Sequence, residues 1–209
     1  MATYDDPRIL RAIAHPTRNR VLHELSAAGS LRAADVAKRT GIPANQASFH
    51  LRQLAKYGLV ELDPDAGRDK RDRVWRLVDD DISIKPRDIV EQPGGEAAYT
   101  VFQRSSVAWG HHLVDQAFTI TREADGEQSK RIVAESSLRL TTDEAEQLHR
   151  EVNEVVARYR DEGRGGADDE REIYSVYQLI QPMPDLAAEH DPVKDEFRVS
   201  GFGAPSAKH

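Results

Sequence analysis

The stretch that decides the fold is LRAADVAKRTGIPANQASFHLRQLAKYG, residues 31–58. Residues 33–40 predict a short helix with Val36 on its apolar side, and Gly41 ends it. A second helix is predicted to begin at Pro43. Proline lacks a backbone N–H, and at the first helical turn this costs little because an N–H there has no intrahelical partner. The stretch therefore predicts two short helices joined by a tight turn.

The second of these helices, residues 44–57, has one buried and one exposed face. Ala47, Leu51 and Leu54 recur at helical spacing, and Gly58 ends the helix as a C-terminal glycine does. The exposed face carries mostly side chains that can hydrogen-bond base edges or phosphates in a major groove: Asn45, Gln46, Ser48, Phe49 and Arg52.

Two short strands, residues 59–62 and 74–78, follow this helix and enclose a turn-rich loop, residues 64–73. Helix, turn, helix and hairpin is the plan of a winged helix-turn-helix domain. The loop is basic, and its cations are candidates for phosphate or minor-groove contact: Arg68, Lys70, Arg71 and Arg73. Three aspartates alternate with these cations, so an ordinary solvated hairpin stays open as the alternative.

Charge is distributed unevenly along the 209 residues, whose net charge is −7. Residues 1–78 contain 14 Lys/Arg and 9 Asp/Glu, a net of +5, whereas residues 79–209 contain 15 and 27, a net of −12. Charges more than about 10 Å apart are largely screened at moderate salt. The basic half can therefore attract DNA phosphates while the acidic half keeps away from them.

Several classes of protein are excluded by composition. The chain has no cysteine, no run of about 18 apolar residues and no basic-then-apolar N-terminal segment, which predicts a cytoplasmic protein without a membrane helix. His111 and His112 are adjacent and point about 100° apart on a helix, so we expect no metal site and no cofactor. The acidic runs 79–81 and 168–170 fall in predicted loops without a partner base, so we expect no enzymatic activity.

The fold class predicted for the whole chain is mostly helical α+β. Its parts are a winged helix-turn-helix domain (residues 1–78), a linker (79–95), a small helix–strand–helix–strand domain for dimerisation or effector binding (96–182) and a flexible tail (183–209). Within the third part we predict helices at 96–121 and 141–162 and strands at 130–140 and 172–181. Thr141 and Glu144 form a capping-box pattern at the start of the second helix.

The long helix carries apolar residues at near-heptad spacing, which suits packing either against a partner subunit or within its own domain. An apolar effector is a further expectation, because aromatic side chains from the helix and the last strand would make a cleft with few polar groups. The candidates for this pocket are Phe102, Trp109, Tyr174 and Tyr177.

Two motifs resemble the ArsR family of bacterial transcriptional repressors: RILRAIAHPTRNRVL (residues 8–22) and QASFHLRQLAKYGLV (residues 46–60). The resemblance covers about residues 6–78. It implies a homodimer that binds a two-fold operator and is released by an inducer. It also places His50, with the five polar and aromatic residues named above, in the recognition helix, and the four loop cations in the wing.

Two departures from the family bear on function. Many relatives sense metals through cysteine pairs, which this chain lacks, and the minimal members have no C-terminal domain. A winged-helix module that binds another protein instead of DNA is the alternative. Salt-dependent binding to duplex DNA separates the two readings, because each Lys or Arg contact to phosphate steepens the salt dependence.

Overall fold

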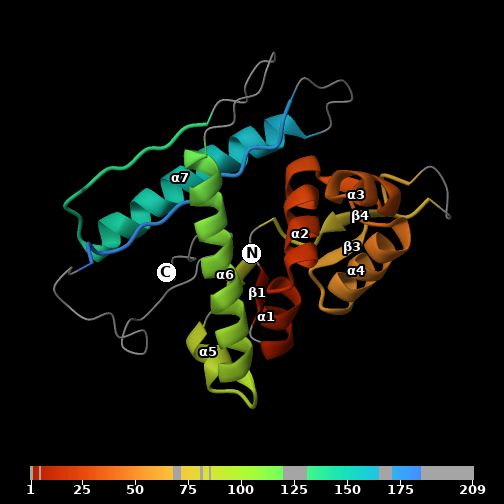
Figure 1. The fold of residues 1–209 in the computed structure, drawn as a ribbon, viewed down its shortest axis with the longest axis horizontal. Helices are drawn as coiled ribbons and strands as arrows, with labels where there is room; N and C mark the ends of the chain where they lie inside the picture. Colours follow the sequence, from red (N-terminus) through yellow and green to blue (C-terminus); the bar gives the residue numbers. More distant parts are fainter. Residues whose placement is uncertain are drawn as a thin grey trace.

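The computed structural model (Figure 1) describes residues 2–4, 6–67, 72–80, 82–84, 86–119, 131–164 and 171–184. Its elements are β1 (Ala2–Tyr4), α1 (Pro7–Ile13), α2 (Pro16–Ala28), β2 (Ser30–Arg32), α3 (Ala33–Thr40), α4 (Ala44–Lys56), β3 (Val60–Leu62), β4 (Val74–Leu77), β5 (Ile82–Ile84), α5 (Pro86–Val90), α6 (Gly95–Phe118) and α7 (Thr142–Gly163).

The N-terminal helices and the hairpin form as the sequence predicts. Helices α3 and α4 are joined by a tight turn, and β3 and β4 pair antiparallel beside them. A third strand, β2, was not predicted: it pairs with the other edge of β4, so Trp75 lies opposite both Leu31 and Leu62. The result is a helix-turn-helix with a small wing-like sheet of three antiparallel strands.

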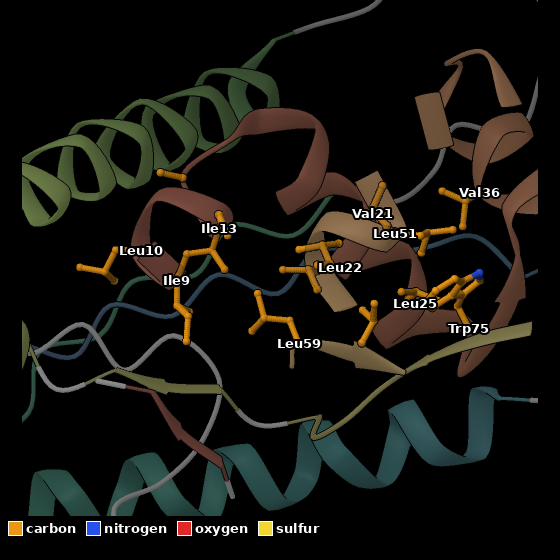
Figure 2. Packing of buried hydrophobic residues seen from close by; sticks show 14 of the residues in the cluster. Ile9, Leu10, Ile13, Val21, Leu22, Leu25, Val36, Leu51, Leu59 and Trp75 are labelled. Carbon is orange, nitrogen blue, oxygen red and sulfur yellow. The ribbon is translucent and has the colours of Figure 1, made fainter. Parts of the chain in front are cut away.

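One hydrophobic core runs from α1 to the wing-like sheet and extends into the second half of the chain (Figure 2). Leu25 and Leu54 are fully buried at its centre. Ile89 of α5 and Ala98 and Phe102 of α6 belong to the same core, because the first turns of α6 pack along α1. The start of the long helix is therefore part of the N-terminal body.

The turn between α1 and α2 is closed by side chains that reach the last carbonyls of α1, residues 11–14. Arg18 donates to two of them, from Nε at 2.7 Å and from Nη2 at 2.9 Å. Asn19 donates to a third at 3.5 Å, and the Ser105 hydroxyl of α6 donates to the fourth at 2.8 Å. Since the last carbonyls of a helix lack intrahelical partners, these donors let the helix end inside the protein.

Residues 79–95 contain β5 and α5 in addition to turns. Strand β5 pairs parallel with β1, with Ala2 opposite Ile82. Helix α5 lies directly against the first turn of α6, and Gly95 makes this approach possible. A Cβ at Gly95 would lie 1.7 Å from the Ile89 carbonyl oxygen, so no other residue fits there without a shift of the backbone.

The structure of the second half of the chain differs from the predicted helix–strand–helix–strand domain. Helices α6 and α7 form, and Thr141 and Glu144 make the expected capping box at the start of α7. The predicted strands at 130–140 and 172–181 are wrong: residues 131–140 and 171–184 contain no strand. A strand needs a hydrogen-bonded neighbour, and no main-chain hydrogen bond joins residues 132–140 or 173–184 to another described residue. The described C-terminal region is therefore mostly helical.

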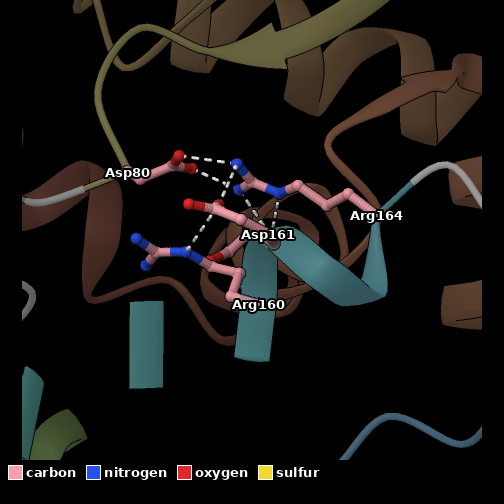
Figure 3. Close-up of polar contacts among 5 residues, drawn as sticks. Asp80, Arg160, Asp161 and Arg164 are labelled. Carbon is pink, nitrogen blue, oxygen red and sulfur yellow. Dashed lines mark hydrogen bonds and ion pairs between the residues drawn. The ribbon is translucent and has the colours of Figure 1, made fainter. Parts of the chain in front are cut away.

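Arg164, directly after α7, joins the C-terminal half to the N-terminal body (Figure 3). Its guanidinium donates to the Ser26 carbonyl near the end of α2, at 2.7 Å from Nη2 and 3.1 Å from Nε. It also binds both carboxylate oxygens of Asp80, with Nη1 2.7 Å from Oδ2. The Arg164 hydrogen bonds hold the pKa of the Asp80 carboxyl below its ordinary value. One side chain thus bridges α7, α2 and the segment that follows β4.

Candidate nucleic-acid interface

Helix α4 is held on the N-terminal body by three side chains that are completely buried, Ala47, Leu51 and Leu54. The turn before it is set by Gly41, whose φ of 72° is left-handed and whose N–H bonds the Ala37 carbonyl at 3.0 Å. A left-handed residue ends α3 and reverses the chain within a few residues. The spacing of the buried residues therefore fixes which face of α4 points outward.

The outward face carries most of the predicted contact residues. Asn45, Gln46, Phe49 and Arg52 are exposed, with half of the Phe49 surface open to solvent, and Ser48 is half-buried. The Arg52 Nε donates to the Ser48 carbonyl at 3.1 Å, which holds the arginine stem along the helix. The structure thus presents amide, guanidinium and aromatic groups together on one solvent-facing surface.

His50 differs from the other predicted contact residues because it is only 8% exposed. Its ring packs on that of His15 at the start of α2, with 5.1 Å between ring centroids, and meets the edge of Phe49. Burial lowers the pKa of His50, and the neighbouring His15 and Arg18 lower it further. Burial, followed by Arg18, also lowers the pKa of His15. His50 therefore faces α2, not the surface.

The wing cations are only partly described. Arg68, Lys70 and Arg71 lie outside the described residues, and Arg73 is exposed at the base of the wing. The neighbouring Asp72 accepts two hydrogen bonds of 2.7 Å from the Arg32 guanidinium at the start of α3. This pairing offsets the acidic charge beside Arg73 and ties the wing to the helix-turn-helix.

Glu24 of α2 is a structural residue that the sequence analysis missed. Its side chain is almost completely buried, with Arg20 at 2.8 Å and Arg39 of α3 at 3.8 Å. A buried carboxylate is stable only when it is paired, so Glu24 connects α2 to α3. The four-residue spacing of Arg20 and Glu24 predicts the ion pair between them. The ion pair of Glu24 with Arg39 joins two helices, so no local sequence pattern predicts it.

The four predicted effector residues do not converge. Phe102 is buried in the core, and Tyr174 is 59% exposed. Trp109 stacks on His23 of α2, with ring centroids 5.9 Å apart, and the Tyr177 hydroxyl lies against Gly110, the next residue of α6. Only Trp109 and Tyr177 therefore reach neighbouring positions.

A hollow of about 300 Å³ lies elsewhere, between the start of α1 and the loop before α6. None of the four predicted effector residues lines it; its lining residues are Asp6, Pro7, Arg8, Arg11, Gln92, Pro93 and Gly94. Across the described ranges no group of three or more His, Asp or Glu side chains is arranged to hold a metal ion. In the same ranges, no helix combines the length and the apolar character needed to cross a membrane.

Comparison with known proteins identifies one part of the chain. Residues 13–63 match a family model described as a helix-turn-helix domain. Among solved structures, the YusO protein of Bacillus subtilis is similar over 73% of this chain and 83% of that one, at 14% identity and a TM-score of 0.29, values too low to carry an argument. No curated protein matches the chain. The chain therefore carries a helix-turn-helix domain, which is typical of DNA-binding transcriptional regulators and of proteins without enzymatic activity.

Proposed function

We propose that this protein is a sequence-specific DNA-binding repressor of the ArsR type that acts as a homodimer. The observation that carries the proposal is the surface of α4. Its buried residues belong to the core, while Asn45, Gln46 and Arg52 are exposed on a helix beside a wing-like sheet. A helix held in this way is able to enter a major groove without unfolding any part of the body.

The residues of α4 divide by the contacts that their chemistry allows. Asn45 and Gln46 can each make paired hydrogen bonds to adenine, and Arg52 can do so to guanine. Phe49 can contact a thymine methyl group. His50 is buried against His15, so its role in this proposal is to fix the orientation of α4 and not to touch DNA.

The surroundings of α4 support phosphate binding. Pro43 precedes the helix and supplies no side-chain cap, so the positive end of the helix dipole is available to a phosphate. The exposed Arg73, together with Arg68, Lys70 and Arg71, adds cations from the wing. These contacts set affinity and orientation, whereas the α4 side chains set sequence preference.

The repressor and dimer parts of the proposal rest on the family resemblance. Two copies would place two α4 helices in successive major grooves, about 34 Å apart, on a two-fold operator. Bound there, the protein would compete with polymerase for a promoter. A small apolar effector near Trp109 and Tyr177 is the proposed inducer, because Trp109 contacts α2 and a ligand beside it would shift α6 against the helix-turn-helix.

The decisive experiment selects bound duplexes from random DNA and footprints the selected sequence. We expect a two-fold site whose affinity falls steeply with salt. Gln46→Ala should cost about 1–3 kcal/mol at one base pair in each half-site and relax the preference there. Arg73→Glu should weaken binding to every sequence and lower the salt slope.

Arg104→Glu is the matched control for the charge change, since Arg104 is exposed on α6 and outside the proposed surface. It should leave both affinity and salt slope unchanged. If wild-type protein binds no duplex at low salt, or if Arg73→Glu and Gln46→Ala bind like wild type, the DNA-binding proposal fails. A module that binds another protein then becomes the better reading.

A further inference from the structure

The described residues after α6 form no buried core. Among residues 131–164 and 171–184 none is buried, although α7 carries an apolar stripe and its capping box is complete. Ordering a residue has an entropic cost that burial of apolar surface normally offsets. A region of this length with nothing buried is therefore incomplete in a single copy.

Residues 132–140 and 173–184 form two extended segments without main-chain pairing to the rest of the described chain. No main-chain hydrogen bond joins residues 132–140 or 173–184 to any other described residue. Figure 1 shows both segments running along α7 in the direction opposite to the helix, so they run in the same direction as each other. Strand, helix and parallel strand is a common unit, but here its two strands are not paired.

The exposed apolar area of this region is large enough for one side of a stable protein–protein interface. Thirteen large apolar side chains of this region are between 43% and 77% exposed. They are Ile132, Val133, Leu138, Leu140, Val155, Tyr159, Ile173, Tyr174, Val176, Tyr177, Leu179, Ile180 and Met183. Together they present on the order of 1,000 Å² of apolar surface, more than the apolar share of the roughly 800 Å² that each partner buries in a standard interface.

The chemistry of this surface indicates what covers it. Residues 173–184 contain no charged side chain, so they offer nothing to a nucleic acid or to a strongly charged protein. Extended segments with unpaired main chain and no net charge associate with other strands, and residues 132–140 contain one acidic and one basic side chain, Glu135 and Arg139. A second copy of this chain supplies the same apolar surface and the same unpaired main chain, and two-fold symmetry pairs a strand antiparallel with its own equivalent.

We propose that two copies of the chain join through an intermolecular β-sheet built from residues 131–140 and 171–181, with both α7 helices packed on one face. The segment ends at residue 181 because proline, which occupies positions 182 and 184, cannot donate to a ladder. This inference rests on the homodimer of the proposed function and names the surface that forms it.

The test measures the mass of the full chain by light scattering and sedimentation, without DNA, over a range of concentrations. We expect the mass of two chains for wild type. Val176→Lys places a charge where the single copy is 62% exposed, and Val176→Pro removes a main-chain donor from the ladder. Each should raise the dissociation constant of the dimer by about tenfold or more, with unchanged helical circular dichroism.

The control is Val107→Lys, because Val107 is 46% exposed on α6 and would lie in the interface of a dimer built on that helix instead. It should leave the dimer intact. Amide hydrogen exchange adds a direct readout: residues 171–181 should exchange slowly in wild type and rapidly in Val176→Pro.

The proposed sheet is contradicted if the wild-type protein has the mass of one chain. It is also contradicted if the wild type is a dimer that Val107→Lys dissociates and the two Val176 variants do not. Rapid exchange of residues 171–181 in a stable dimer also overturns it. These results are separate from DNA binding. A dimer that binds no duplex contradicts the repressor and leaves the sheet standing, whereas a monomer that binds its site contradicts the sheet and the homodimer and leaves DNA binding standing.

Discussion

The two halves of this chain bury their apolar residues in opposite ways. Residues 6–102 contain Leu10, Leu25, Leu51 and Leu54, all with no exposed surface, in one continuous core. Residues 131–164 and 171–184 contain apolar side chains of the same kinds, and none is buried. The difference shows that apolar content alone does not predict burial within one copy of the chain.

The largest effect is expected from truncating matched leucines in the two halves. Leu54→Ala removes a fully buried side chain and should lower the free energy of unfolding by about 2–5 kcal/mol. Leu138→Ala, at a position 62% exposed in one copy, should change it by less than about 0.5 kcal/mol when unfolding is measured at a protein concentration below the dissociation constant of the proposed dimer. Denaturant unfolding, followed by Trp75 fluorescence in a Trp109→Phe background, measures both. Equal losses would remove the contrast between the halves.

A second change tests how tightly the N-terminal body packs where α5 meets α6. Gly95→Ala puts a methyl group where the Ile89 carbonyl oxygen lies, 1.7 Å from the ideal Cβ position. The backbone must shift, at a cost of about 1–3 kcal/mol. Gly163→Ala is the control in the second half, because a Cβ there meets nothing within 4 Å. Thermal unfolding of the two variants should differ clearly.

A third change tests the contact between the halves. Arg164→Ala leaves the Ser26 carbonyl and Asp80 without this donor and should cost about 1–2 kcal/mol, in the range of hydrogen bonds to charged groups. Arg164→Lys keeps the charge but not the paired geometry, so it should fall between wild type and alanine. A double-mutant cycle with Asp80→Asn isolates the pair. A coupling energy near zero would show that the ion pair contributes nothing.

The smallest effect is a pH dependence in the N-terminal half. His15 and His50 have lowered pKa values in the fold, so the unfolded chain binds more protons than the native one. Stability should be full above their ordinary pKa of 6.5 and decline as the pH falls below it. His50→Gln should flatten part of this decline, and His23, whose pKa burial also lowers, should account for another part. Urea unfolding between about pH 7.5 and 5 measures the slope.

Local patterns predicted the helix-turn-helix because its signals lie within a few residues of one another. The spacing of Ala47, Leu51 and Leu54 gave the buried face of α4, and Gly41 gave the turn. The same spacing places His50 on the buried face of α4, because it comes three residues after Ala47 and four residues before Leu54. His50 is counted among the DNA-contacting candidates only through the resemblance to the ArsR family.

Other features could not be read from local patterns. Strand β2 has three residues, too few for a periodic signal, and its partner β4 begins more than 40 residues later. The two strands β1 and β5, in which Ala2 pairs with Ile82, are even farther apart in the sequence. For residues 130–140 and 172–181 the pattern predicted strands, but strand formation depends on a hydrogen-bonded neighbour, and the described residues of the single chain supply none for 132–140 and 173–184. Three wing cations and the region after residue 184 lie outside the described residues.

The Arg164 bridge has a consequence for how the molecule can be divided. A fragment that stops before α7 keeps the whole hydrophobic core, yet it loses the cation that closes the end of α2 and neutralises Asp80. The helix-turn-helix half is therefore stabilised in part by a residue that lies far outside it in the sequence. Grafting it onto another C-terminal partner should succeed best when the new partner brings an arginine to the same place.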